Sequence, residues 1–336
     1  MATGIDDARV ERWFVEHVGV QGPLEFTQVL GGHSCLTFFV DTPDGARFVL
    51  RRPPVGQILR SAHDVVREHT AITALADTDV PVAPVRGLCI DLDVTGAPFY
   101  VMDFVPGFVL HDRAAAEAVD PAARRRAAES MIEVLVALQS IDPDDVGLGE
   151  LGRPTDYLGR QLRRWRGQWE QADTRPMPRM SELYDWLEAN QPEEGPAGIV
   201  HGDFRLGNAI HHEDGSVAAL LDWELCTLGP RNADLSYLLR SWDSGEASGA
   251  SAVASSAPGF PDRDGIVAYY EAVSGRPVDH LDYWMAFHAY RSACIVAGVF
   301  TRYKHGQLGE PTNDFAHFED AVETGMLAGL DAAGIR

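Results

Sequence analysis

Residues 200–224, VHGDFRLGNAIHHEDGSVAALLDWE, contain the pattern that decides the fold. A short loop ending at Asn208 is followed by the turn Glu213-Asp214-Gly215. An apolar run at 217–221 then ends at Asp222. Apolar segments on either side of a glycine-containing turn are typical of a β-hairpin. We therefore expect Asn208 and Asp222 to lie side by side at the open edge of this hairpin.

The same stretch brings together the side chains that phosphoryl transfer requires. A carboxylate and an amide oxygen, here from Asp222 and Asn208, are hard ligands suited to Mg²⁺, which takes few protein ligands and shares itself with phosphates. Asp203 precedes Asn208 by five residues and is placed to orient a hydroxyl or accept its proton. A cap or turn role would explain each residue alone. It does not explain all three in this order.

The order H-G-D-x-x-x-x-N, followed by D-W-E, resembles the kinase-like phosphotransferases of the aminoglycoside phosphotransferase and choline kinase superfamily. Within it, the chain is most similar to the phosphotransferase-like branch that also occurs fused to acyl-CoA dehydrogenases. The resemblance covers nearly the whole chain. The supporting segments are V-L-R-R-P-P (49–54), S-A-H (61–63), R-E-H (67–69), V-P-V-A-P (80–84), P-F-Y-V-M-D-F-V-P-G (98–107) and L-D-W-E-L-C-T-L-G (221–229).

This resemblance implies an α+β, protein kinase-like fold of two lobes. Residues 1–105 are expected to form a nucleotide-binding lobe, a small antiparallel sheet with one main helix. Residues 106–336 are expected to form a helical lobe with the catalytic loop and the substrate site. The resemblance further implies ATP as donor, Mg²⁺ held by Asn208 and Asp222, and Asp203 as the catalytic residue.

Apolar periodicity predicts the elements of both lobes. The order of strands and helices in the first hundred residues matches the small lobe of a kinase. The predicted strands are 24–30, 35–42, 47–52, 85–91 and 98–105, and the predicted helices are 6–18, 62–76, 124–140, 157–172, 180–189, 232–242, 263–273, 282–304 and 314–332.

Composition limits the class of protein. A chain of 336 residues is long for one core, and its 45% hydrophobic content is ordinary for a globular protein. The N-terminus lacks the basic segment of a secretory signal, no apolar run reaches the ~20 residues of a membrane span, and the four cysteines form no C-x-x-C. We therefore expect a cytoplasmic protein with no membrane partner and an oligomeric state that the sequence leaves open.

The net charge of −22 argues against nucleic acid or an anionic membrane as a partner. It would suit a cationic substrate such as an aminoglycoside. A generally acidic surface is the simpler interpretation, and we favour it.

Strand alternation in the small lobe indicates how a nucleotide would be held. Val49 and Arg51 share one face of the strand at 47–52, and Arg52 lies on the other. By the resemblance, Val49 stacks on the purine, Arg51 occupies the position of the phosphate-binding lysine, and Glu68 is its ion-pair partner. Arginine can bind phosphate through two nitrogens, so the role survives the replacement. Arg52 remains the alternative.

Two backbone segments complete the predicted nucleotide site. Gly31, Gly32 and Ser34 lie in a turn whose N–H groups could approach phosphates, although hairpin turns use glycine in any case. Residues 102–105 resemble the kinase hinge, and there the backbone of Asp103 and Val105 is expected to contact the adenine edge. An ordinary edge strand is the alternative.

Other residues near the catalytic stretch are assigned supporting roles. His201 is expected to orient the loop, and Asp234 resembles the helix-borne aspartate that braces it. Arg205 has two open assignments, contact with a phosphate or acidic group and a solvated surface position. His211 and His212 should face opposite sides of a strand, which disfavours a shared metal site.

Three functions remain in competition. The first is a kinase that moves the γ-phosphoryl group of ATP to the hydroxyl of a small-molecule substrate. The substrate is either a hydroxyacyl-CoA, suggested by the branch that the chain resembles, or another metabolite alcohol. The second is a catalytically silent kinase-like nucleotide-binding protein. The third, a metal-dependent hydrolase, lacks the extra ligands that a two-metal site needs.

Overall fold

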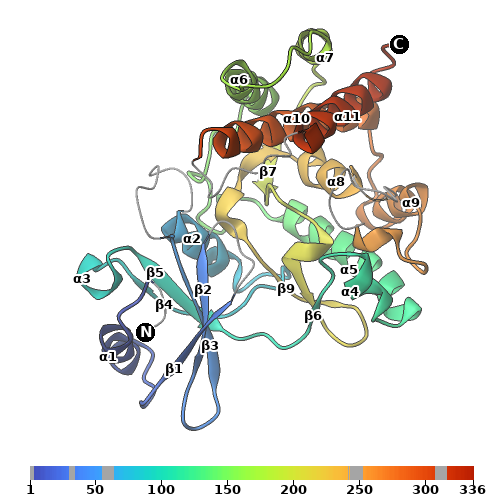
Figure 1. The fold of residues 1–336 in the computed structure, drawn as a ribbon. Coiled ribbons are helices and arrows are strands. Elements are labelled where there is room, and N and C mark those ends of the chain that lie inside the picture. Colours follow the sequence, from blue (N-terminus) through green and yellow to red (C-terminus); the bar gives the residue numbers. More distant parts are fainter. Residues whose placement is uncertain (1–3, 30–34, 55–63, 241, 243–252, 307–315) are drawn as a thin grey trace.

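The computed structural model describes residues 4–29, 35–54, 64–240, 242, 253–306 and 316–336. Figure 1 shows a small lobe built around a sheet and a larger lobe that is mainly helical, with the two ends of the chain in different lobes. This arrangement confirms the α+β class. The boundary after residue 105 stays a prediction, although β6 (Phe108–Val109) already pairs with β8 (Ala209–His211) in a second sheet.

The small lobe is an antiparallel five-stranded sheet covered on both faces. Alternate residues of β3 point to different sides: Phe48 and Leu50 pack with α1 (Asp7–His17), whereas Val49 belongs to the core on the side of α2 (Val65–Leu75). Burying apolar side chains on both faces stabilises this register. The strand order is β1 (Glu25–Val29), β2 (Leu36–Asp41), β3 (Arg47–Arg52), β5 (Phe99–Asp103) and β4 (Val85–Cys89).

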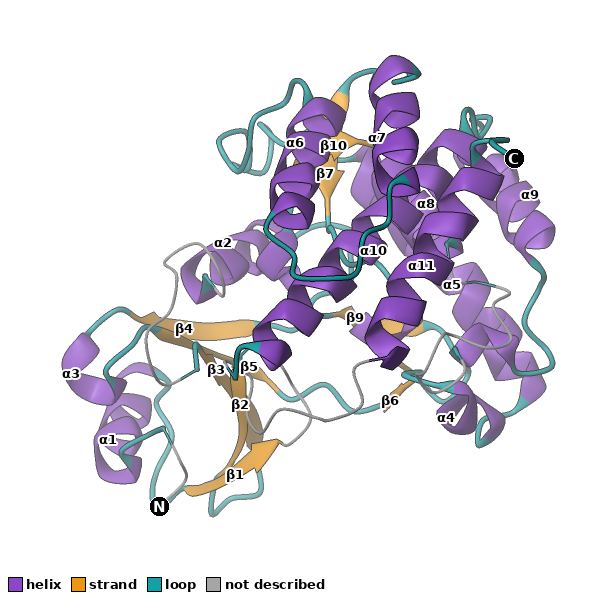
Figure 2. Ribbon diagram, turned by 45° about the horizontal axis from the view of Figure 1, so that its top comes forward, coloured by secondary structure: helices purple, strands orange, loops and turns teal. Residues whose placement is uncertain are grey.

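The large lobe is organised around the long helix α10 (Leu281–Lys304). It packs against α11 (Ala316–Ala332) over most of its length and also touches three further helices, α6 (Tyr157–Glu170), α7 (Arg179–Ala189) and α8 (Asn232–Leu239) (Figure 2). The remaining helices are α4 (Arg113–Glu117), α5 (Pro121–Ser140) and α9 (Arg263–Ser274). By the criterion of length and hydropathy, the described helices include none that could span a bilayer.

The predicted catalytic hairpin is present. Strand β8 pairs antiparallel with β9 (Val217–Leu220), and Gly215 in the turn has a φ of +95°. A Cβ atom at Gly215 would lie 2.0 Å from the Ala123 carbonyl oxygen of α5, so the turn needs glycine for its backbone and for its packing. The hairpin is thereby fixed against the helical lobe.

Several short elements were not predicted, α4 among them. The short helix α3 (Leu92–Thr95) stands where only a hairpin turn was expected, because Asp91 caps it and Gly96 ends it in the left-handed conformation. Strand β10 (Thr227–Pro230) pairs with β7 (Ala197–Val200), and β6 adds a third strand to the hairpin. Strands of two to four residues carry too few side chains for alternation to show.

Candidate active site

A buried aspartate holds the loop that follows β7. The Asp234 carboxylate accepts hydrogen bonds from the backbone N–H groups of His201 at 2.7 Å and Gly202 at 2.9 Å. Burial raises the pKa of Asp234, and the charge of His201 and these two hydrogen bonds oppose the rise. The His201 ring hydrogen-bonds the Leu221 carbonyl oxygen at 2.8 Å, which joins the loop to the end of the hairpin. Both side chains therefore make the bracing contacts expected of them.

Asp203 is held in place by three donors. Its carboxylate accepts from the Tyr237 hydroxyl, from Asn208 Nδ2 at 2.7 Å and from Arg205 Nε at 3.3 Å. Its side chain is still 20% exposed. A carboxylate fixed from the protein side and open on the other can orient a hydroxyl or accept its proton.

Tyr237 and Arg205 were not assigned to Asp203 from the sequence. Tyr237 lies three residues after Asp234 on α8, so both side chains share one helix face toward the catalytic loop. That spacing is the signal that could have found Tyr237. Arg205 pairs with Asp203 and is exposed. It is therefore a surface residue, as one of its two predicted assignments has it, but it also lies beside the candidate catalytic carboxylate.

Asn208 and Asp222 come together as the hairpin predicts. The Leu221 N–H donates to the Asn208 carbonyl oxygen at 2.7 Å. Asn208 comes just before β8 and Asp222 just after β9, so both lie at the open end of the hairpin. Asn208 Nδ2 donates to the backbone carbonyl and the carboxylate of Asp203, which leaves its amide oxygen for another partner. Asp222 adopts the left-handed conformation, with φ +66°. Two hard oxygen donors at a partly exposed edge fit a Mg²⁺ ion that keeps most of its ligands from phosphate and water.

Arg51 connects the small lobe to this edge. Its Nη1 lies 3.3 Å from Glu68 Oε1, and its Nη2 lies 3.0 Å from Asp222 Oδ1. Burial alone would lower the pKa of Arg51, but Glu68 and the other anionic groups nearby raise it well above its usual value. The predicted Arg51–Glu68 pair is therefore present. The second contact, with the candidate metal ligand, was not predicted.

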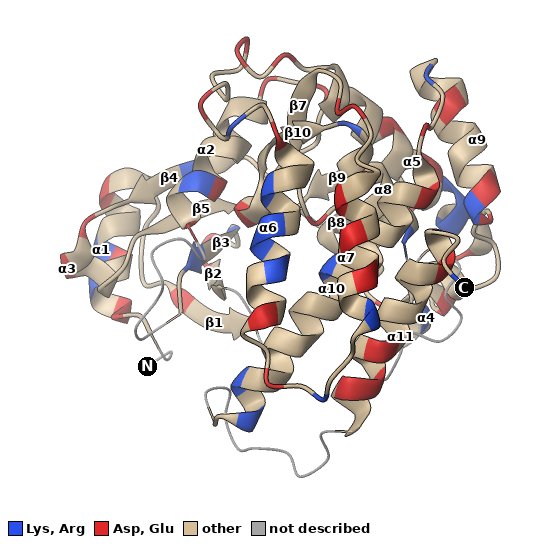
Figure 3. Cartoon of the chain, turned by 90° about the horizontal axis from the view of Figure 1, so that it is seen from above, with Lys and Arg blue, Asp and Glu red and all other residues tan. Residues whose placement is uncertain are grey.

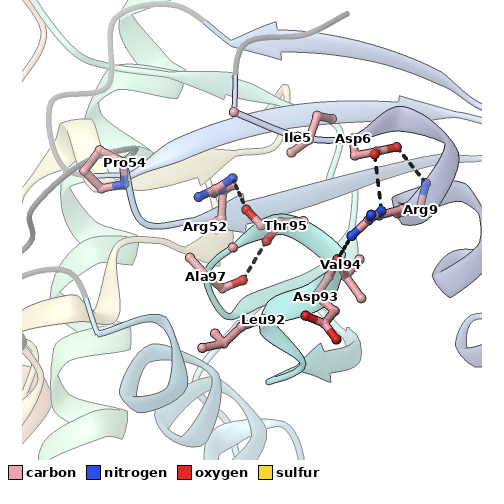
Figure 4. Close-up of a pocket in the computed structure, with 12 residues that line it drawn as sticks. Ile5, Asp6, Arg9, Arg52, Pro54, Leu92, Asp93, Val94, Thr95 and Ala97 are labelled. Atoms are coloured by element: carbon pink, nitrogen blue, oxygen red, sulfur yellow. Dashed lines mark hydrogen bonds and ion pairs between the residues drawn. The ribbon is translucent and has the colours of Figure 1, made fainter.

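Arg52 points away from this site. It donates to the carbonyl oxygens of Thr95 at 3.0 Å and Pro53 at 3.1 Å. It lines a cavity of about 590 Å³ beside α3, together with Arg9 and other residues of the outer face of the lobe (Figure 4). Among the described candidates, Arg51, Glu68, Asp203, Asn208 and Asp222 do not line that cavity. The geometry thus favours Arg51 over Arg52 at the lysine position.

The structure describes only part of the rest of the predicted nucleotide site. Val49 is buried and pairs with Met102 in the sheet, on the side that faces Arg51. The Asp103 N–H donates to the Pro84 carbonyl oxygen at 2.9 Å, so this N–H is already used within the lobe. The Asp103 carboxylate pairs with Arg86. The predicted phosphate contacts of Gly31, Gly32 and Ser34 lie outside the described residues, and the backbone roles given to Asp103 and Val105 stay predictions.

The burial of Glu68 leads to a prediction about stability. Burial, with Asp222 nearby, raises the pKa of Glu68 from 4.5 to about 7, while Arg51 opposes the rise. Between pH 4.5 and about 7, the folded state therefore binds more protons than the unfolded state, so the free energy of unfolding decreases as pH rises. The stabilisation contributed by protonated Glu68 is fully present below about pH 4.5 and is lost as pH rises to about 7. Glu68→Gln cannot titrate. We expect the parent-minus-variant free energy of unfolding to fall by about 1–3 kcal/mol across this range.

Urea denaturation of both proteins at about pH 5, 6 and 7.5 measures this difference. Glu193→Gln, at an exposed position, is the control for losing a carboxylate. A difference between parent and Glu68→Gln that stays constant with pH would show that Glu68 does not titrate in this range.

Comparison with known proteins agrees with the geometry. Residues 25–269 match the model of the phosphotransferase enzyme family, which is well over half of the chain. The chain belongs to this family. Across 98% of both chains, it superposes on a solved Ralstonia eutropha protein, provisionally named an aminoglycoside phosphotransferase, with 34% identity and a TM-score of 0.84.

Two further comparisons concern a longer relative of this phosphotransferase and a more distant solved structure. It is 35% identical to mouse acyl-CoA dehydrogenase family member 10 over 306 residues, which cover 87% of this chain but 28% of that protein. The similarity therefore concerns one part of a longer relative. The aminoglycoside phosphotransferase APH(4)-Ia, solved with ADP and hygromycin B, shares the fold at 15% identity and a TM-score of 0.63 over 95% of this chain. The kinase-like fold expected from the sequence is thus confirmed.

Proposed function

We propose that this phosphotransferase uses ATP and Mg²⁺ to transfer the γ-phosphoryl group to a hydroxyl of a small molecule. The observation that carries the proposal is the grouping of Asp203, Asn208 and Asp222. Asn208 hydrogen-bonds Asp203, the Leu221 N–H bonds the Asn208 carbonyl just before Asp222, and Arg51 reaches Asp222 from the other lobe. This set contains two metal ligands, a cation for phosphate and a base, which are the parts of a phosphoryl-transfer site. The likeness of its fold to a protein solved with ADP and hygromycin B supports nucleotide use.

Each residue has a distinct task in this proposal. Asn208 and Asp222 would hold Mg²⁺, which neutralises charge on the nucleotide phosphates when bound. Arg51, held by Glu68, would turn its free N–H groups toward those phosphates. Asp203 would align the acceptor hydroxyl and take up its proton, since Tyr237 and Asn208 fix the carboxylate in one orientation.

The two adjacent arginines provide a matched pair for testing the phosphate contact. Arg51→Ala should weaken ATP binding by about tenfold or more, because charge-assisted hydrogen bonds to phosphate are lost, while adenosine binding changes little. Arg52→Ala should affect ATP and adenosine alike, since Arg52 contacts backbone carbonyls beside α3. Calorimetric titration with both ligands distinguishes the two. The opposite pattern would transfer the phosphate contact to Arg52.

The acceptor that we propose is a hydroxyacyl-CoA or another metabolite alcohol. The support is the 35% identity with part of an acyl-CoA dehydrogenase family member. A panel of hydroxylated metabolites and aminoglycosides, assayed for ADP release, tests the acceptor class. Release with aminoglycosides alone would refute this choice of acceptor and leave the phosphotransferase proposal intact.

One observation favours a second candidate, a nucleotide-binding protein without turnover. Arg51 pairs directly with Asp222, so a candidate metal ligand is already neutralised by a guanidinium. If this pair persists with nucleotide bound, metal binding is weakened. Binding of ATP with the same affinity in the presence and absence of Mg²⁺, without ADP release, would support this alternative.

A further inference from the structure

Two arginines from different helices meet beside the catalytic loop. Arg164 of α6 and Arg291 of α10 both line a cavity of about 60 Å³, together with Trp165 and Gly202. Gly202 is the residue immediately before Asp203. The cavity is therefore adjacent to the carboxylate that would meet the acceptor, and it is too small for more than one compact group.

Among the described residues, these two arginines have no carboxylate within ion-pair distance. On the same helix, Arg163 pairs with Asp156 and Arg166 pairs with Glu170. Figure 3 shows α6 with several basic residues along its length. The chain has a net charge of −22, so carboxylates are abundant, yet none of those described pairs with either arginine of this cavity.

The two guanidinium groups also act on each other. Partial desolvation, together with the positive charge of Arg291, lowers the pKa of Arg164. Holding two like charges together costs free energy unless a third group of opposite charge joins them. An anion bound between them would remove the repulsion and accept hydrogen bonds from N–H groups that have no partner among the described residues.

Arg291 also connects this cavity to Asp203. Its guanidinium lies 5.0 Å from the centre of the Tyr237 ring, and its Nη2 donates to the Gly202 carbonyl oxygen at 3.3 Å. Tyr237 in turn donates to Asp203. The Nε of Arg291 is buried and has no hydrogen-bond partner among the residues described. A ligand held by Arg291 would therefore lie within reach of the candidate base.

We propose that Arg164 and Arg291 form a subsite for an anionic group of the acceptor, a carboxylate or a phosphate monoester, and so select anionic alcohols over neutral and cationic ones. The inference rests on the proposed function, since it assigns the acceptor of that reaction. It contradicts the simple expectation that an acidic protein selects a cationic substrate. The charge of the preferred substrate depends on the side chains at the site itself, because exposed charges more than about 10 Å away are largely screened at ordinary ionic strength.

The first test measures anion binding without any turnover. Inorganic phosphate and acetate are titrated calorimetrically into the protein with saturating Mg-ADP, which occupies the proposed nucleotide site. The parent should bind at least one of the two anions, and the one bound more tightly identifies the preferred group. Arg164→Gln should weaken that binding by about tenfold or more, the effect expected for losing a charge-assisted hydrogen bond.

Arg163→Gln is the matched control, because it removes the same charge from the neighbouring position of α6, where Asp156 is the partner. It should leave anion binding unchanged. Equal affinities in the parent, Arg164→Gln and Arg163→Gln would overturn the subsite. So would a lack of binding of both anions to the parent.

The second test uses turnover and separates this inference from the proposed function. Matched alcohols of equal length, carrying a carboxylate, a phosphate, a hydroxyl or an amine at the far end, are compared as acceptors. Anionic acceptors should have the higher kcat/KM. Arg164→Gln and Arg291→Lys should mainly raise KM for them, because a contact remote from the reacting oxygen contributes uniform binding. Turnover that prefers the amine or the diol would refute the subsite and uphold the phosphotransferase.

Discussion

Asp203→Asn should lower kcat by about 10²–10⁴-fold, the usual effect of removing a positioned base. The variant retains the shape of the side chain but cannot accept the proton of a hydroxyl. Mg-ATP affinity should change little, because the partners of the Asp203 carboxylate among the described residues are Tyr237, Asn208 and Arg205, and Arg51, the proposed phosphate contact, is not among them. The melting temperature should fall only slightly, since an amide oxygen can still accept from one of these donors.

Single-turnover transfer to an identified acceptor, beside ATP titration and thermal melting, measures the three quantities. Asp185→Asn makes the same isosteric change at an exposed position of α7 and should be silent in all three. If Asp203→Asn turns over at nearly the parental rate, the residue only braces the loop.

Asp222→Ala should remove most metal-dependent nucleotide binding. The variant loses one of the two proposed protein ligands of Mg²⁺, whose electrostatic contribution is worth several kcal/mol, so Mg-ATP affinity should fall about 100-fold or more. Arg51 keeps its pair with Glu68, so the small lobe should remain folded. Calorimetry with ATP, with and without Mg²⁺, measures the effect.

Two variants make this result specific. Asp222→Asn retains an oxygen donor but loses the charge, so its Mg-ATP affinity should lie between those of the parent and the alanine variant. Asp185→Ala removes a surface carboxylate and should not matter. Parental Mg-ATP affinity in Asp222→Ala would mean that Asp222 does not hold the metal.

Contacts between segments that are close in the sequence were predictable from the residue pattern. Two apolar segments around a turn predicted that Asn208 and Asp222 would be neighbours, and the backbone hydrogen bond from Leu221 to Asn208 makes them so. Strand alternation put Arg51 on the same side as Val49, and the following helix supplied Glu68. Each of these pairs of neighbours is separated by only one turn, or by one strand and the next helix. Over such short segments, periodicity alone shows which way the side chains point.

Relations between distant segments were not predictable in the same way. The contact of Arg51 with Asp222 joins residues 171 positions apart and depends on how one lobe meets the other. The contacts of Tyr237 with Asp203 and of Arg291 with Gly202 depend on how α8 and α10 pack against the catalytic loop. No local period carries that information.

The most direct test of the central claim is ADP release by the purified protein with Mg-ATP, across a panel of hydroxylated acceptors that includes anionic, neutral and cationic alcohols. The account predicts release that requires both Mg²⁺ and an anionic acceptor, that is lost in Asp203→Asn and Asp222→Ala, and that yields a phosphorylated acceptor in equal amount. Mg-ATP binding with no acceptor-dependent release from any member of the panel would contradict it.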